Sequence, residues 1–403
     1  MRRVVIVGMG IVSSIGNNSR EVLRSLRDGR SGIEFIPERK ELGFRSALGG
    51  TIRDLSPLDI PKRTLRQMGR GSYLATHAVL QALENARLSR REVQNEQTGL
   101  IIGNMGNMRD AYDFCHKFHV EGKNPGGIAY SRAMASSVTA NLSVFFGIQG
   151  NTMTVSAACA SGGSAIGQAF LNIRFGLQNR YLCGGVQEDS WQSICLFDAM
   201  RNFSIREHEP TKASRPFDTQ RDGLVPSCGS GFVVIEEYEL ARARGAHIYA
   251  ELIGYGTVAD GYNMTLPSGT GSIQCIKRAI QDAGIEAEDI DYINAHATST
   301  SAGDSVEAHA IAQVFGQKPN VSSTKSITGH ELGAAGSNEL IYTLLMMEHG
   351  FIAPNINLDE IDKDCLGINI VANRMIEKDL NIAMSNSFGF GGVNTCLIIG
   401  RVV

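Results

Sequence analysis

The sequence has 403 residues, which is too many for one small hydrophobic core and predicts two domains or one large duplicated domain. A hydrophobic content of 43%, a charged content of 20% and a net charge of −3 are typical of a globular protein, and they exclude a strong overall field for nucleic acid or a membrane surface. No apolar stretch reaches the roughly 20 residues that a membrane span requires. We therefore expect a cytoplasmic protein that binds neither nucleic acid nor membrane.

Short apolar runs alternate with helical patterns along the chain. The first of them, in MRRVVIVGMG, is better interpreted as a buried strand than as a signal peptide. Such alternation predicts an α/β fold, in which helices cover a mixed or parallel sheet. The predicted strands are residues 4–7, 99–102, 181–183, 232–235, 292–294, 321–323, 382–385 and 395–399. The predicted helices are residues 72–86, 160–175, 273–283, 305–314 and 336–348.

Two pairs of segments repeat about half a chain apart. Residues 82–93 match residues 279–290, each with a helix end, a turn and the approach to a strand. Residues 155–176 match residues 321–350, each with a strand, a small-residue turn and a helix. Chance similarity between amphipathic helices is the alternative, but two matches in the same order favour an internal duplication.

Cys159 differs in its setting from the other seven cysteines, which form no CxxC pair and are interpreted as small core residues. It follows a β-favouring run and stands at the start of a predicted helix, where unpaired N–H groups and the helix dipole should lower the pKa of a thiol. A buried structural cysteine is the alternative when Cys159 is considered alone. In a duplicated fold, the matching turns would bring Lys325 and His330 close to it.

Two further segments carry side chains suited to a site. His296 follows a predicted strand in HATSTSAGD, with Thr298 and Thr300 beside it, and ligands bind beyond strand ends in open α/β sheets. Lys325 and His330 lie in SSTKSITGHELGAAG, which lacks the second histidine of a HExxH zinc motif. A capped loop histidine and a solvated turn are the alternatives for these two segments.

A glycine-rich segment, SNSFGFGGVN, occupies residues 385–394 and includes Phe388 and Phe390. Alternating glycines free the backbone to present N–H groups or to move. The segment has no Lys-Ser/Thr pair and leads into a strand, so a phosphate-binding loop is disfavoured.

One cysteine, two histidines and one lysine, each in a small-residue turn, resemble the pattern of the β-ketoacyl-acyl-carrier-protein synthases of the thiolase superfamily, and most of all their bacterial type I members. The resemblance runs along the whole chain, through GMGIVSSIGNN, RPFDTQRDGLV, ARGAHIYAE, HGFIAPNINL and NSFGFGGVN. It implies a five-layered, internally duplicated αβαβα fold and a homodimer. It also implies an N-terminal half, residues 1–250, with the nucleophile and cap insertions, and a C-terminal half, residues 251–403, with the histidines and the lysine.

The resemblance implies an acyltransferase of fatty-acid elongation, which joins an acyl thioester to malonyl-acyl carrier protein by a decarboxylative Claisen condensation. Cys159 would carry the acyl group, and its N–H would form the oxyanion hole with that of Phe390. His296 and His330 would donate N–H groups to the enolate that forms when CO₂ leaves, rather than activate the sulfur. Lys325 would orient them. No metal or redox cofactor is implied, because the thioester and the leaving CO₂ drive the reaction, and the substrates would arrive on the phosphopantetheine of the carrier. The implied substrate-binding residues are Thr298, Thr300, Phe388 and Glu307, the last as the acidic residue near the lysine.

An acidic carrier protein requires a local basic patch on this weakly charged chain. The segment PKRTLRQMGR supplies one, and its spacing predicts one helical face of arginines, with a solvated charge run as the alternative. Such a contact would be weak and salt-sensitive. The predicted docking residues are Lys62, Arg63, Arg66 and Arg70.

Two departures from the family pattern leave the preferred acyl chain length and unsaturation open. Ala297 stands where a glycine is usual, and the segment 103–108 is bulkier than expected near the acyl pocket. A thiolase would need a second catalytic cysteine in a C-terminal glycine-rich loop, and Cys396 lies instead in a predicted strand. A type III synthase would carry an asparagine at the position of His330. A type II synthase, or one dedicated to a polyketide or aryl-polyene pathway, is the alternative. A non-catalytic chain-length partner is less favoured, since it would lack the nucleophile.

Overall fold

Two sets of five strands and a short edge strand form one sheet of 11 strands in residues 1–402, the part of the chain that the computed structural model describes. The first set runs in the order β5 (Thr152–Val155), β4 (Thr98–Asn104), β6 (Arg180–Gln187), β7 (Gly229–Glu237) and β1 (Val4–Ser13). The second runs in the order β10 (Asn320–Ser322), β9 (Tyr292–Asn294), β14 (Ile382–Gly389), β15 (Val393–Gly400) and β8 (Ala250–Ala259), with β12 (Asn369–Ile370) beyond β10. Numbered within its own half, each set has the order 3-2-4-5-1, which confirms the predicted duplication.

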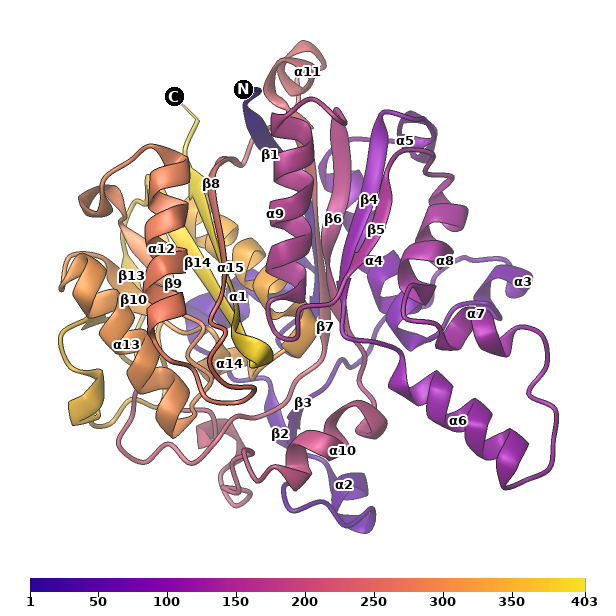
Figure 1. Cartoon of the computed structure of the whole chain (residues 1–403), viewed down its shortest axis with the longest axis horizontal. Helices are drawn as coiled ribbons and strands as arrows, with labels where there is room; N and C mark the ends of the chain where they lie inside the picture. Colours follow the sequence, from indigo (N-terminus) through magenta and orange to yellow (C-terminus); the bar gives the residue numbers. More distant parts are fainter. Residues whose placement is uncertain (403) are drawn as a thin grey trace.

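Helices lie outside both sets of strands and between them, which gives the predicted five layers (Figure 1). The helices outside the first set are α4 (Arg70–Asn85) and α8 (Ser137–Phe146). Those outside the second set are α12 (Thr270–Ala283) and α13 (Ser301–Phe315). The middle layer consists of α9 (Ser161–Arg174), α15 (Ala335–His349) and, beside α15, α1 (Ser19–Asp28).

Glycines in β1 and β8 let the outer helices approach the sheet closely. A Cβ added at Gly8 would lie 2.4 Å from the carbonyl oxygen of Ala82, and one at Gly254 would lie 2.5 Å from that of Ala279. Because Ala82 and Ala279 are equivalent in the sequence repeat, the duplication extends to these backbone contacts. β8 was not predicted from the sequence, because glycine lowers strand propensity. Only the close approach of the outer helix explains why glycines stand in this strand.

The predicted elements all overlap observed ones, and the strand at the N-terminus continues through its glycines to Ser13. The short edge strand β5 was not among the predicted elements. The boundary between residues 250 and 251 stays a prediction. The remaining strands are β2 (Ile33–Phe35), β3 (Leu48–Gly50), β11 (Phe351–Ile352) and β13 (Ile376–Glu377). The remaining α-helices are α2 (Pro37–Glu41), α3 (Lys62–Leu65), α5 (Arg90–Val93), α6 (Met108–His119), α7 (Ala129–Ala133), α10 (Trp191–Ala199), α11 (Tyr238–Ala243) and α14 (Lys325–Thr328). Among residues 1–402, no helix is both long enough and apolar enough to cross a membrane.

Candidate active site

Two turns, one from each half of the fold, meet at Cys159, as the sequence repeat predicts. Cys159 lies two residues before α9, and Nε2 of His330, on the turn between α14 and α15, is 3.0 Å from its Sγ. The two helices are in backbone contact, because a Cβ added at Gly336 would lie 2.8 Å from the nitrogen of Gly163. Ala158 has a φ of 47°, a left-handed conformation that strains a residue with a side chain. The turn at Cys159 is therefore held in place by packing rather than by local preference.

The second histidine, His296, lies two residues after β9 and faces the first. Its ring is perpendicular to that of His330, with 5.3 Å between the ring centroids. Burial, together with the ammonium of Lys325, lowers the pKa of both histidines well below the usual value. Both imidazoles are therefore neutral near pH 7, and each can donate one ring N–H to an oxygen in the cavity.

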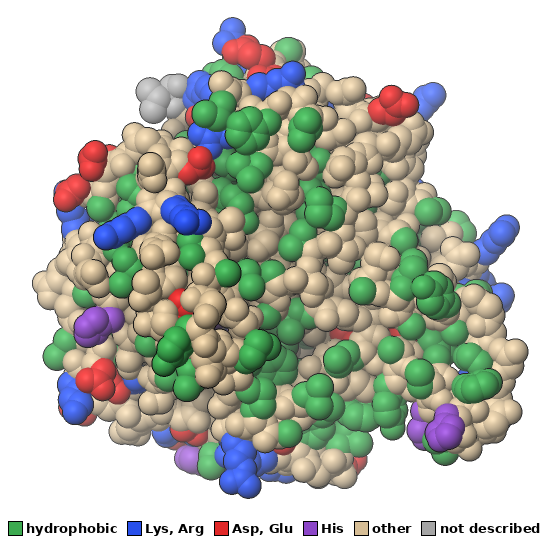
Figure 2. Space-filling model, in the orientation of Figure 1, with side chains coloured by type: hydrophobic (Ala, Val, Ile, Leu, Met, Phe, Trp, Pro, Cys, Tyr) green, Lys and Arg blue, Asp and Glu red, His purple; other side chains and the backbone are tan. Residues whose placement is uncertain are grey.

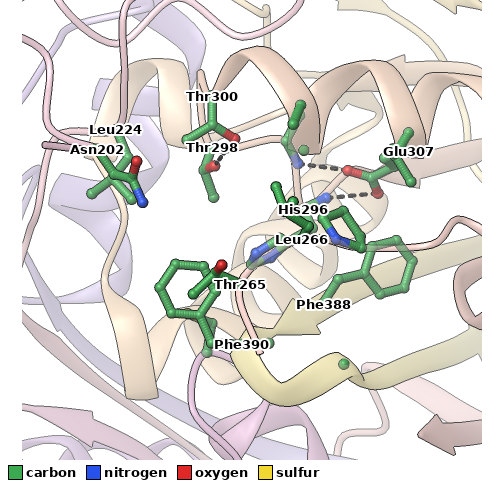
Figure 3. A pocket seen from close by; sticks show the side chains of 18 of the residues that line it. Asn202, Leu224, Thr265, Leu266, His296, Thr298, Thr300, Glu307, Phe388 and Phe390 are labelled. Atoms are coloured by element: carbon green, nitrogen blue, oxygen red, sulfur yellow. Dashed lines mark hydrogen bonds between the residues drawn. The ribbon is translucent and has the colours of Figure 1, made fainter. Parts of the chain in front are cut away.

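Glu307 of α13 fixes the backbone around His296. Its two carboxylate oxygens accept hydrogen bonds from the N–H groups of His296, at 2.9 Å, and Ala297, at 2.6 Å (Figure 3). Nδ2 of Asn386 also donates to this carboxylate, at 3.0 Å. Glu307 therefore orients the strand end that carries the histidine.

Lys325 is fully buried, and its ion pair is with Glu339 of α15. The oxygens of Glu307, which the resemblance gives as the acidic residue near the lysine, instead accept hydrogen bonds from backbone N–H groups. Burial raises the pKa of Glu339 to about 7, against the opposing effect of the lysine. Glu339 was not predicted as a site residue, although a lone glutamate within the apolar stripe of a predicted buried helix is a signal for it.

The predicted lowering of the pKa of the Cys159 thiol is wrong. Burial raises the pKa to about 11, and the opposing effects of the Lys325 ammonium and of the N–H groups of Phe390 and Cys159 are smaller. Desolvation outweighs the helix start because Cys159 is buried. At neutral pH Cys159 is therefore a thiol rather than a thiolate.

The glycine-rich segment packs directly against the nucleophile turn. A Cβ added at Gly389 would lie 3.3 Å from the nitrogen of Cys159, and the N–H of Phe390 points to the sulfur. Gly391, with a φ of 81°, donates its N–H to the carbonyl of Met264 at 2.8 Å. The segment thus lies between the nucleophile and a loop that follows β8.

A cavity of about 420 Å³ opens at Cys159. Thr298 and Thr300, whose hydroxyl oxygens are 3.1 Å apart, face Phe390 across it (Figure 3). Lys325 does not reach the cavity wall. The other predicted residues that line the cavity are His296, His330, Glu307 and Phe388, and lining residues that the analysis missed include Asn202, Leu224, Thr265 and Leu266.

An apolar cluster surrounds Cys159 on the side of α10. It includes Ile194 and Phe203, and Met105 of the bulky segment 103–108 packs against it. Met105 also lies close to Gly333, where an added Cβ would be 3.0 Å from its Cγ. Met105 is therefore the large side chain of this segment that lies beside the Cys159 cluster. Ala297 lines the cavity as well.

The predicted basic face is wrong as a single helical surface. α3 ends at Leu65 and Arg70 begins α4, because the intervening Gly69 is extended and buried. Arg70 makes two hydrogen bonds with the carboxylate of Asp189, at 2.9 and 2.8 Å. Of the four predicted docking residues, Lys62, Arg63 and Arg66 are exposed.

Comparison with known proteins identifies the whole chain. The model of the β-ketoacyl synthase N-terminal domain matches residues 1–241, and that of the C-terminal domain matches residues 249–359. The chain is 45% identical to 3-oxoacyl-acyl-carrier-protein synthase 1 of Escherichia coli strain K12, with 100% of both chains covered. The crystal structure of a β-ketoacyl synthase from Burkholderia phymatum superposes with a TM-score of 0.97 at 36% identity, again over 100% of both chains. A ketosynthase solved in complex with a type II polyketide acyl-carrier protein superposes with a TM-score of 0.91 at 30% identity and the same coverage.

Proposed function

The chain belongs to the β-ketoacyl synthase family, as an acyltransferase of fatty-acid elongation, and we propose that its condensation reaction is centred on Cys159. In this reaction an acyl thioester and a malonyl thioester give a 3-oxoacyl thioester and CO₂. The observation that carries the proposal is the 3.0 Å separation of Sγ of Cys159 and Nε2 of His330, inside a cavity that also holds His296. One thiol and two neutral imidazoles are what an acyl-transferring, enolate-forming site requires.

In the first half-reaction, Sγ of Cys159 attacks the carbonyl of the acyl thioester. The thiol proton passes to the departing thiolate, and His330 is the base that stands close enough to carry it. This role differs from the sequence expectation that the histidines serve only the enolate, and it follows from the high pKa of the thiol. The N–H groups of Cys159 and Phe390 would stabilise the tetrahedral oxyanion.

In the second half-reaction, the C–C bond to the carboxylate of malonate breaks and CO₂ leaves. The electron pair of the broken bond forms an enolate. The enolate oxygen accepts hydrogen bonds from the ring N–H groups of His296 and His330. The enolate carbon then attacks the acyl carbonyl, and Cys159 leaves as a thiolate that is reprotonated. Burial, and after it the fixed charge of Lys325, lower the pKa of both imidazoles and keep them neutral.

The substrates would arrive on the phosphopantetheine arm of an acyl carrier protein, which the name of the Escherichia coli relative includes. Thr298 and Thr300 would hold the arm in the cavity mouth, with Phe388 and Phe390 on its other sides. The exposed Lys62, Arg63 and Arg66 would dock the acidic carrier, and we omit Arg70 because Asp189 holds it. The absence of a resident cofactor and the cytoplasmic location stay predictions.

A homodimer is supported by the free edge of the sheet. β5 is the last strand of the first set, and an unpaired edge readily pairs with another chain. Apolar side chains are exposed near it, including Met153, Val144 and Tyr130. Figure 2 shows hydrophobic side chains gathered on the side where Figure 1 places α6 and α7. Sedimentation of the purified protein as a monomer would contradict the dimer.

Two variants of Cys159 test the catalytic proposal. Cys159→Ala should abolish condensation, measured by mass spectrometry of products from acyl and malonyl carrier protein. Cys159→Gln should keep malonyl decarboxylation, measured as CO₂ release, because His296 and His330 are intact. Full condensation by the alanine variant, or loss of decarboxylation in the glutamine variant, would contradict the assigned roles.

A further inference from the structure

The three reactive side chains of the cavity also form a compact set of soft donor atoms. One ligand atom each from Cys159, His296 and His330 lies within 4.8 Å of the others, and all three residues are buried. Within residues 1–402, this is the one group of three or more histidine, cysteine or acidic side chains with such spacing. It combines a sulfur with two ring nitrogens. Such a donor set binds zinc in preference to the alkaline-earth cations, which take oxygen ligands.

The spacing of these atoms suits a tetrahedral ion. Zn²⁺ binds sulfur at about 2.3 Å and imidazole nitrogen at about 2.0 Å, so its neighbouring donor atoms are roughly 3.5 Å apart. That separation falls between the 3.0 Å of the Sγ–Nε2 pair and the 4.8 Å limit of the whole set. Small rotations of the side chains would complete three corners of the tetrahedron. The fourth corner would be open to a water molecule or a substrate atom.

We propose that Cys159, His296 and His330 bind one Zn²⁺ ion, which inhibits the enzyme reversibly by occupying its nucleophile. On binding, the S–H bond of Cys159 breaks, the proton leaves to solvent and a Zn–S bond forms. The ion stays divalent, so no oxidant or reductant is consumed. Binding of the ion does not require the catalytic roles proposed above, because ligation depends only on the donor atoms and their geometry; the inhibition rests on the proposed function.

The surroundings make the bound ion removable rather than permanent. Zinc binds the neutral imidazole through one ring nitrogen, and two imidazoles with such a nitrogen lie within reach of the sulfur, which favours ligation. Against it, Nδ1 of His296 and Nδ1 of His330 have no hydrogen-bond partner in the described part of the chain, and loss of such a partner typically costs about 10–100-fold in affinity. The field of Lys325 also opposes a cation, although its ion pair with Glu339 offsets that charge. These terms predict an inhibitory ion that a chelator removes.

The test is a cobalt titration of the purified full-length protein. The parent protein carries Cys115→Ser, because Cys115 is exposed on α6 one helical turn before His119 and could bind metal by itself. Cobalt(II) chloride should produce a thiolate-to-cobalt charge-transfer absorption that saturates at one ion per chain. Cys159→Ala in the same parent should lose this absorption, whereas Cys365→Ala, which removes a buried cysteine outside the cavity, should keep it.

A second readout needs no variant of the site. Free Zn²⁺ at ten times its dissociation constant leaves about one site in eleven empty, so alkylation of Cys159 by iodoacetamide should slow about elevenfold and recover with EDTA. An unchanged alkylation rate, or a cobalt absorption that survives Cys159→Ala, overturns the inference. Both readouts work without turnover. A protein that binds cobalt through Cys159 but performs no condensation would therefore count against the proposed function and for the metal site.

Discussion

The two turns that meet at the cavity are equivalent in the duplicated fold, yet they differ in charge. The turn at Cys159 leads into α9 through small uncharged residues, and its one reactive group is a neutral thiol. The turn at Lys325 includes the buried Glu331. It leads into α15, which is buried along almost all its length and carries the buried Glu339. A duplicated backbone thus brings two strand–turn–helix units together, and divergence of one of them supplies the electrostatics of the site. Burial of charge makes the second turn the more costly one to disturb.

The largest effect is expected from removal of the buried ammonium. Lys325→Met leaves Glu339 buried without its partner and should lower the free energy of unfolding by about 3–5 kcal/mol, measured by urea denaturation at pH 8. At lower pH the loss should shrink, because Glu339 can then take up a proton. By comparison, Cys159→Ala in the uncharged turn should cost about 1 kcal/mol.

A double variant separates stability from catalysis in the same pair. Lys325→Met combined with Glu339→Leu removes both charges and should recover most of the lost stability. Condensation should stay low, because the fixed charge beside the histidines is absent. Recovery of full activity together with stability would show that the ion pair serves only the fold.

The next effect concerns pH and Glu331. Burial raises its pKa from the ordinary value of 4.5 to about 8, although Asn338 donates to it at 2.7 Å. Tyr342 also donates, at 2.9 Å. The folded protein therefore holds a proton that the unfolded chain releases. The stability from this group is complete below pH 4.5 and is lost as the pH rises through 8, by up to about 1.4 kcal/mol for each pH unit.

Glu331→Gln should flatten that part of the pH dependence, because the amide is neutral at every pH and keeps a similar shape. The measurement is the free energy of unfolding between pH 5 and pH 8, for the variant and the parent. Equal slopes for the two proteins would show that Glu331 is ionised in the folded state.

A smaller effect is expected where the two central helices touch. A Cβ added at Gly336 would lie 2.5 Å from Oγ of Ser387 and 2.8 Å from the nitrogen of Gly163. Gly336→Ala should therefore cost about 1–3 kcal/mol and slow condensation, because it separates the two turns. Gly127→Ala is the matched control, since no atom lies within 4 Å of its added Cβ. Similar melting temperatures for the two variants would contradict a tight contact between the helices.

The smallest effect is expected at the surface. Arg63→Glu combined with Arg66→Glu should raise KM for carrier-bound substrates several-fold at low salt and leave kcat nearly unchanged, because surface contacts steer association. The control is Arg242→Glu, an exposed arginine on α11. An unchanged KM in the double variant would place carrier docking elsewhere.

Local patterns and the family resemblance together were enough to identify most of the site. Small residues around Cys159, the strand before His296 and the apolar helix after His330 are features of short segments, and the repeat linked the turns across the chain. β8 could not be predicted in the same way, because its glycines have a reason only when α12 is packed against them. Arg70 was misjudged for a similar reason, since Asp189 is far from it in the sequence.

The sequence by itself was enough to predict which groups form the proposed site: one thiol, two imidazoles and one ammonium in turns of a duplicated α/β chain. Only the tertiary structure decided their states. A helix start alone favours a thiolate, but the enclosure of Cys159 raises the pKa of its thiol to about 11. The choice of Glu339 rather than Glu307 as the partner of Lys325 was decided in the same way. The physical reason is that desolvation and pairing depend on every segment that packs around a group, and those segments come from distant parts of the chain.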